Sequence, residues 1–428
     1  MNWFSVDFMR KIPELAILLL LMALPLFGQE KRLWVLRAPG EMVEYDATTF
    51  AVKQTVKVPP EALTTPGGIE VNHLGQILFA TPAELPLAAE DVRSPHQVWF
   101  WNGHAASTIN QGVKREVVTA GSNQAVTESA PNVYLSADGT HLYWFANEAR
   151  RLQREEMDLS TATTWQAWRT DLPGGSREDL ASVKLPDCPC ATGVCTETCP
   201  YGGQWAPPGG IEKFFLMTQY VAGQTEITYE KSTRYQEQGG KWTGTPLDKP
   251  LERELDAASG GDLIVEAIPD AGCCGWSNES NDQTLVLGQG KTRVVFDELA
   301  TFKNPDYDVS FYTSNARLSP DLGSVAMTIV ATAEPNKPIQ LSEQGQANPE
   351  ESEHIRKALA ELPAVEVKSV EDPPKRVAFV PHAMLVGWIS EKELLIVEDH
   401  VLVLYNVGTG ARKKSTVRVE DVSRVFLR

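Results

Sequence analysis

The sequence lacks the short motifs that mark the commonest hydrolases and nucleotide-binding enzymes. It contains no His-Glu-x-x-His pair, no Gly-x-Ser-x-Gly elbow, no phosphate-binding glycine loop and no dinucleotide fingerprint. Histidine is scarce, and its seven copies stand singly, so each is interpreted as a surface or turn residue rather than a metal ligand. The sequence therefore predicts no catalytic residue, no metal site and no cofactor, and it favours a protein that is not an enzyme.

Long apolar runs are also missing, with one exception at the start of the chain. Arg10 and Lys11 precede an apolar stretch at residues 15–27, which stops at Gly28. A basic segment followed by a short apolar run is typical of a secretory signal, and a bilayer span needs about 20 apolar residues. We therefore predict a signal peptide at residues 1–28 and an exported, periplasmic or extracellular product.

An uncleaved N-terminal anchor is the alternative to a cleaved signal. Leu26 stands three positions before the expected cut, where a small residue is usual. No Cys follows Gly28, which argues against a lipoprotein anchor. No later stretch is apolar over the length of a membrane span, so we expect a soluble mature domain without stable membrane insertion.

Positive charge is in deficit. With 39 Lys and Arg against 56 Asp and Glu, the chain carries a net charge of −17, which argues against nucleic acid or anionic lipid as a partner. The 31 glycines and 28 prolines are scattered rather than periodic, which excludes a collagen-like chain. Their distribution suits many short strands joined by turns.

Helical spacing is nearly absent from the mature chain. Short apolar or alternating runs, rich in β-branched and aromatic residues, are typical of strands. Such runs lie at residues 33–38, 76–81, 97–102, 141–146, 213–221, 261–268, 293–299, 324–331, 383–389, 393–399 and 401–407. One inserted surface helix is predicted at residues 348–362, where Asn348 caps, Pro349 takes the first helical position and Pro363 ends the helix.

A turn motif recurs between pairs of these strands. Residues 136–139 (Ser-Ala-Asp-Gly) and 319–323 (Ser-Pro-Asp-Leu-Gly) each separate two apolar runs, and residues 72–79 and 388–396 are fainter copies. The Asp side chain can bond the backbone of the turn it opens, while Gly accepts a positive φ. This pattern resembles the Ser-Pro-Asp-Gly turn of the TolB-like and Trp-Asp-repeat-like β-propellers, which joins two strands of each blade.

The resemblance implies an all-β fold, a β-propeller of about six or seven blades in a single domain at residues 29–428. Strand candidates at residues 33–37 and 422–427 fit a ring closed by pairing the two ends of the chain. Two unrelated edge strands in a pair of β-sandwiches are the alternative. The copies depart from the pattern, because Ala137 replaces the Pro and Leu322 separates Asp from Gly, and this leaves the blade number open.

The six cysteines fall in only two places. A Pro- and Gly-rich loop at residues 185–208 holds four of them, and a vicinal pair precedes Gly275 and Trp276; the six are Cys188, Cys190, Cys195, Cys199, Cys273 and Cys274. An even count in an exported chain indicates disulfides, and the loop has few apolar residues to hold its shape. We expect the vicinal pair to be bonded to the loop, although 15 pairings are open in principle.

Two other interpretations of the cysteines stay open. The spacing Cys195-x3-Cys199 with Cys190 upstream could supply thiolates to zinc or to an iron–sulfur cluster, although paired Cys-x2-Cys spacing is more usual. A redox-active vicinal disulfide is the third interpretation. An oxidising compartment favours structural disulfides over both.

The function predicted from these features is that of an exported, non-enzymatic propeller that binds a protein or a cell-envelope component and is a monomer. A possible recognition surface comprises Trp205, Trp276 and Asn278, because aromatic side chains on loops held by disulfides can recognise a partner. The alternatives are a propeller hydrolase or lyase that acts on carbohydrate, and the propeller component of an envelope peptidase or transport system.

Overall fold

The computed structural model describes the chain from Lys31 to Arg428 apart from several internal segments. Those outside the description are residues 66–67, 81–91, 121–122, 130–131, 137, 155–156, 173–174, 185–200, 207–213, 223–226, 240, 248–252, 258–262, 269–282, 289, 299–310 and 332–348. The signal peptide, all six cysteines, Trp276 and Asn278 lie outside the described residues, so the predictions made on them stay predictions.

The strands form six antiparallel sheets, five of which have four strands. The first is β29 (Val425–Leu427), β1 (Arg32–Arg37), β2 (Glu41–Asp46) and β3 (Val52–Lys57). The next is β13 (Tyr201–Ala206), β14 (Phe214–Ala222), β15 (Ile227–Gln238) and β16 (Lys241–Pro246). It is followed by β17 (Arg253–Ala257), β18 (Leu263–Ile268), β19 (Gln283–Gly288) and β20 (Lys291–Asp297). The last two are β21 (Phe311–Leu318), β22 (Ser324–Ala331), β23 (Ala364–Ser369) and β24 (Arg376–Pro381), then β25 (Ala383–Ser390), β26 (Glu393–Glu398), β27 (Val401–Asn406) and β28 (Arg412–Arg418).

The remaining sheet has nine strands and contains two four-stranded units. One unit is β4 (Ile69–Val71), β5 (Ile77–Phe79), β6 (Val92–Trp101) and β7 (Ala106–Ala120), and the other is β9 (Asn132–Leu135), β10 (His141–Arg154), β11 (Met157–Asp171) and β12 (Arg177–Lys184). Between them, β8 (Asn123–Ser129) pairs with the far halves of both β7 and β10. Counted by units, the described strands make seven blades in six sheets.

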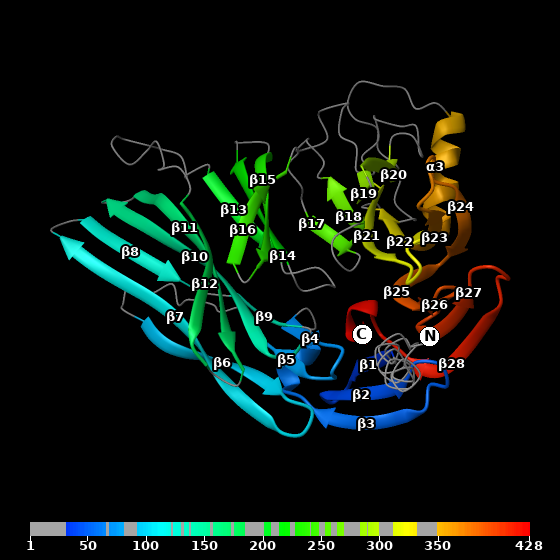
Figure 1. Ribbon diagram of the computed structural model, residues 1–428, viewed down its shortest axis with the longest axis horizontal. Helices are drawn as coiled ribbons and strands as arrows, with labels where there is room; N and C mark the ends of the chain where they lie inside the picture. Colours follow the sequence, from blue (N-terminus) through cyan, green and yellow to red (C-terminus); the bar gives the residue numbers. More distant parts are fainter. Residues whose placement is uncertain are drawn as a thin grey trace, which may run out of the picture.

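The sheets follow one another around a ring in chain order (Figure 1). The first strands of the units are neighbours, since β21 contacts both β17 and β25, β25 contacts β29, and β4 contacts β9. The chain is a β-propeller, as predicted. Parts of β7, β10 and β11, together with β8, extend beyond the ring, and we call this extension the wing (Figure 1).

The ring is closed by the two ends of the described chain. β29 pairs with β1 in antiparallel register, with Trp34 opposite Phe426, and Arg32 and Arg428 exchange main-chain hydrogen bonds of 2.7 and 2.9 Å. The predicted closure is confirmed. The closing strand is shorter than predicted, because Asp421 accepts the Ser423 N–H at 2.8 Å and starts a 3-10 turn over Val422–Arg424.

The hydrophobic core lies between consecutive sheets. Leu33 and Tyr45 of the first unit pack with Leu395 and Leu404 of the last, and Phe145 of the third packs with the fourth. Strands inside the sheets, such as β1, β26 and β27, therefore present apolar residues to both faces of their sheet, and this explains the continuous apolar runs in the sequence. Such packing is what a ring of twisted sheets requires.

The one predicted helix is present as α3 (Pro349–Glu361), inserted between β22 and β23. It is not purely a surface element. Ile355 and Leu359 are only 1% and 3% exposed and pack into the cluster between the fifth and sixth units.

Candidate functional site

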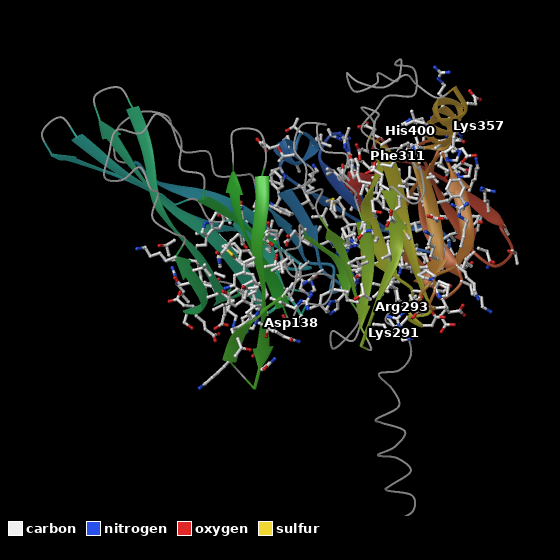
Figure 2. The ribbon with its side chains drawn as sticks, turned by 90° about the horizontal axis from the view of Figure 1, so that it is seen from above. Asp138, Lys291, Arg293, Phe311, Lys357 and His400 are labelled. Atoms are coloured by element: carbon white, nitrogen blue, oxygen red, sulfur yellow. The ribbon has the colours of Figure 1, made fainter. Side chains whose placement is uncertain are left out.

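The antiparallel strands give the ring two faces of different character. Turns between the first and second strands, and between the third and fourth, lie on one face, which we call the turn face. The other connections lie on the opposite face, which we call the loop face. Figure 2 shows this separation: Asp138, Lys291 and Arg293 lie on one side, and Phe311, Lys357 and His400 on the other.

Most of the longest connections leave the loop face. β18 ends at Ile268 and β19 begins at Gln283, while β12 ends at Lys184 and β13 begins at Tyr201. These four strand ends flank the two cysteine-bearing segments and belong to the loop face. The insertion that contains α3 and the wing also leave from this side (Figure 2).

The structure places one of the three predicted recognition residues. Trp205 lies in β13 opposite Met217. Because β13 runs from the loop face toward the turn face, the backbone at Trp205 is nearer the turn face than the strand start at Tyr201 is. Trp276 follows β18 in the chain and is outside the described residues.

The turn face is built from the predicted motif. Asp138 Oδ1 accepts the Ser136 hydroxyl at 2.8 Å and the Thr140 N–H at 3.0 Å. Asp321 Oδ1 accepts the Ser319 hydroxyl at 2.5 Å and the Gly323 N–H at 3.1 Å in the same way. Burial alone would raise the pKa of Asp138, but the bonds from Thr140 and Ser136 outweigh it and lower the pKa.

The departures from the motif have local explanations. Leu322 occupies the position that Gly139 holds in the other turn, and both have positive φ, 60° and 68°. In the fainter copy, Asn72 stands where the other turns have Ser, and its Oδ1 accepts the N–H groups of Leu74 and Gln76 at 3.1 and 3.0 Å. One Asn side chain thus takes the place of the Ser and Asp pair. The Ser-x-Asp chemistry is therefore one of two ways of making this turn.

Two carboxylates tie neighbouring units together where the first strands approach the turn face. Glu70 of β4 accepts the N–H of Leu135 in the next unit at 2.5 Å. Asp256 of β17 accepts the N–H of Leu318 in the next unit at 2.6 Å. Leu135 and Leu318 each directly precede a Ser-x-Asp turn, so the two carboxylates occupy equivalent places in the repeat.

Glu70 is surrounded by protein, although part of its surface is still exposed to solvent. This burial raises the pKa of its carboxyl from 4.5 to about 7, against the opposing effects of the Leu135 N–H and of Arg428. Burial, with a smaller contribution from Glu70, also raises the pKa of the Tyr134 hydroxyl to about 12. At neutral pH Glu70 is thus divided between its acid and its carboxylate form.

Three cations lie at the same end of the first strands. Arg317 Nη1 donates to the main-chain oxygens of Leu255 and Ala316 at 2.6 and 2.8 Å. Arg428 Nε donates to the Val71 oxygen at 2.6 Å, and Lys31 directly precedes β1. Together with Glu70 and Asp256, these cations form what we call the axial cluster, which consists of Lys31, Glu70, Asp256, Arg317 and Arg428.

The axial cluster was not predicted from the sequence. Its signal is a charged residue between apolar ones at the end of a short strand, as in Ile69-Glu70-Val71 and Leu255-Asp256-Ala257. Within the described part of the chain, no group of three or more His, Cys, Asp and Glu side chains is arranged to hold a metal ion. Nor does any described helix have the length and apolarity to cross a membrane.

The sequence matches no family model and no curated protein. Among solved structures it is similar to apo AztD from Citrobacter koseri, with 8% identity over 93% of this chain and 98% of that chain and a TM-score of 0.38. It is also similar to dipeptidyl peptidase 4 from Porphyromonas gingivalis, with 10% identity, coverage of 92% and 59% and a TM-score of 0.42. The WD40 domain of SCAP from fission yeast gives 9% identity, coverage of 92% and 85% and a TM-score of 0.32.

This chain spans about three fifths of that peptidase. All three identities are near or below 10%, and all three TM-scores are below 0.5. The propeller fold therefore follows from the strand order and the ring closure of this chain.

Proposed function

We propose that the protein is an exported, non-enzymatic β-propeller that binds a protein or a cell-envelope component through its loop face. One observation supports this most directly: the wing, α3 and the strand ends that flank both cysteine-bearing segments belong to the same face. Binding residues of proteins lie disproportionately on loops that a rigid scaffold positions. The six antiparallel sheets provide that scaffold.

Export and disulfide formation are part of the proposal. Export directed by residues 1–28 would place the six cysteines in an oxidising compartment. Because the strands that flank the two cysteine-bearing segments end on one face, a bond from the pair at residues 273–274 to the loop at residues 188–199 is compatible with the fold. Non-reducing peptide mapping should find such a cross-link, and six free thiols with stoichiometric zinc would contradict it.

The recognition surface would centre on Trp276 and Asn278, beside the disulfide-bonded loop. Trp205 is its third predicted member and lies within β13. We expect a substitution at Trp276 to weaken partner binding more than one at Trp205, because β13 carries Trp205 away from the loop face.

A hydrolase or lyase acting on carbohydrate is the alternative, and Glu70 favours it. A buried carboxyl with a pKa near 7 is suited to act as a general acid. Against this, both Glu70 and Asp256 accept main-chain N–H groups and so have a packing role. The other alternative, a role as the propeller component of an envelope peptidase or transport system, is consistent with binding at the loop face.

Site-specific photo-crosslinking distinguishes these functions. A photoreactive residue is placed at Lys357 or His400 on the loop face, or at Lys291 or Lys392 on the turn face as matched controls. We expect adducts with envelope fractions of the producing cells only from the two loop-face positions. Equal labelling from both faces, or release of sugars from envelope glycans that Glu70→Gln abolishes, would contradict binding through the loop face.

A further inference from the structure

Among the described residues, one buried cation of the propeller has no carboxylate partner. Arg293 lies in β20 near Lys291, at the turn face (Figure 2), and only 7% of its surface is exposed. Its Nε donates no hydrogen bond, and its Nη1 donates a single bond of 3.3 Å to the main-chain oxygen of Gly288. Buried polar groups nearly always have partners, and buried charges need them most. The guanidinium group of Arg293 therefore calls for an explanation.

Arg293 lies on the face of its sheet that meets the sixth unit. It stands opposite Val286 in the pair of β19 and β20, and opposite residues of neighbouring strands share one face of a sheet. Val286 packs in the core cluster that the fifth and sixth units form together, with Val325 and Met327 of β22. The guanidinium group is thus placed at the junction of two units.

Contacts from the sixth unit reach β20 on both sides of Arg293. Two residues before it, Lys291 Nζ donates to Asp372 Oδ2 at 3.3 Å. Two residues after it, the main-chain oxygen of Val295 accepts a bond of 2.5 Å from Lys368 Nζ. The sixth unit therefore brings a second cation, Lys368, close to Arg293 along the strand.

The buried carboxylate of β23 is already shared by two cations. Glu366 Oε1 accepts a bond of 2.5 Å from Arg376 Nε, and its Oε2 lies 3.7 Å from Lys368 Nζ. Arg293 forms no ion pair with Glu366 or with any other Asp or Glu that the structure describes, although the chain holds 56 of them. Positive charge at this junction thus exceeds the negative charge that the described residues bring to it.

We propose that Arg293 is the main contact of a binding site for a small tetrahedral oxyanion, phosphate or sulfate, between the fifth and sixth units at the turn face. A guanidinium group presents its N–H groups in a planar fork that suits the oxygens of such an anion. Lys368 adds positive charge from the neighbouring unit. Because so little of Arg293 is exposed, a small anion suits this place better than a macromolecule does.

The test measures binding of inorganic phosphate, and separately of sulfate, to the full mature chain by calorimetry at constant ionic strength set with chloride. Arg293→Met replaces the guanidinium group with an uncharged side chain that keeps much of the apolar stem. Arg418→Met makes the same change at an exposed position of β28 and serves as the matched control. We expect Arg293→Met to weaken binding of both anions at least about tenfold, and Arg418→Met to bind as the wild type does.

Thermal unfolding gives a second measurement, because a ligand that binds only the folded chain stabilises it. Phosphate and sulfate also stabilise folded proteins in general, by exclusion from their surface. The comparison between variants separates the two effects. The unfolding temperature of the wild type and of Arg418→Met should show a saturable rise with phosphate, which Arg293→Met should lack.

Either of two results would overturn the proposal. One is the absence of saturable phosphate and sulfate binding to a wild-type chain whose cooperative unfolding shows that it is folded. The other is equal affinity of the wild type and Arg293→Met, which would place the anion elsewhere. If Arg293→Met does not fold, Arg293→Gln takes its place with the same expected loss. Neither result affects the loop-face proposal, which is tested by crosslinking.

Discussion

At the scale of residues, single carboxylates connect neighbouring units of the propeller. The bonded residues are far apart in the sequence. Glu70 and Leu135 are 65 residues apart, and Asp256 and Leu318 are 62 apart, yet each pair forms the same carboxylate to N–H bond. Buried main-chain N–H groups need such acceptors, and hydrogen bonds to charged groups contribute about 1.5–3 kcal/mol. These two residues therefore fix how the second unit meets the third and how the fifth meets the sixth.

Glu70 should make stability depend on pH. Its pKa is about 7 in the folded protein and near 4.5 when unfolded, so between these values the unfolded chain releases a proton that the folded chain keeps. Stability should therefore fall as pH rises from about 4.5 to about 7 and then level off. In Glu70→Gln this component should disappear, since the amide oxygen still accepts the Leu135 N–H but does not ionise.

Urea unfolding at several pH values between 4.5 and 8 measures this effect. An exposed control on the same face, Glu391→Gln, should keep the wild-type dependence on pH. If Glu70→Gln also keeps it, Glu70 is ionised in the folded protein throughout this range, and burial does not raise the pKa of its carboxyl.

Some hydrogen bonds of single side chains could be predicted from the sequence alone, and others could not. The bonds of Asp138 and Asp321 to Ser, Thr and Gly groups nearby were predictable because all partners lie within a few residues. The role of Glu70 was not, because it depends on which strand lies next to β4. A single sequence contains the turn chemistry but not the pairing of distant strands.

At the scale of elements, α3 shows that capping residues predict where a helix begins and ends, but not whether its side chains are buried. Predicted residues 348–362 and observed Pro349–Glu361 nearly coincide, since Pro349 and Pro363 mark the ends. The burial of Ile355 depends on the neighbouring sheets. The wing was not predicted, because residues 110–120 and 147–154 are polar and show little of the apolar alternation that indicates a strand.

Substitutions in α3 should separate a packed helix from a purely exposed one. Ile355→Ala and Leu359→Ala each remove a buried side chain and should lower the free energy of unfolding by about 2–5 kcal/mol. Lys357→Ala, on the exposed side, should change it by less than about 0.5 kcal/mol. Chemical denaturation of the three variants gives these values, and equal small effects would mean that α3 does not pack on the ring.

At the scale of the whole molecule, closure of the ring depends on three residues of β29. A chain that ends at Arg424 lacks the pairs of β29 with Leu33, Trp34 and Val35. It should also expose apolar surface between the first and last units, where Leu33 and Leu395 pack. We therefore expect a clear loss of stability and of cooperative unfolding.

Calorimetry and dye binding to exposed apolar surface test this expectation. Arg418→Ala, an exposed residue on the outermost strand of the last unit, serves as a control and should unfold as the wild type does. A truncated chain that unfolds at the wild-type temperature would show that packing between the sheets closes the ring without β29. The ends of the chain were predicted to pair because both are apolar and strand-like.

The attachment of the wing gives it a mechanical property. β8 is hydrogen-bonded on one side to β7 and on the other to β10, so two units of the ring share one continuous ladder. A force applied at the tip is therefore divided between two anchorages, and tearing one unit away would require breaking the bonds of β8 as well. The wing therefore couples the second and third units of the ring to each other through the strand pairs of β8.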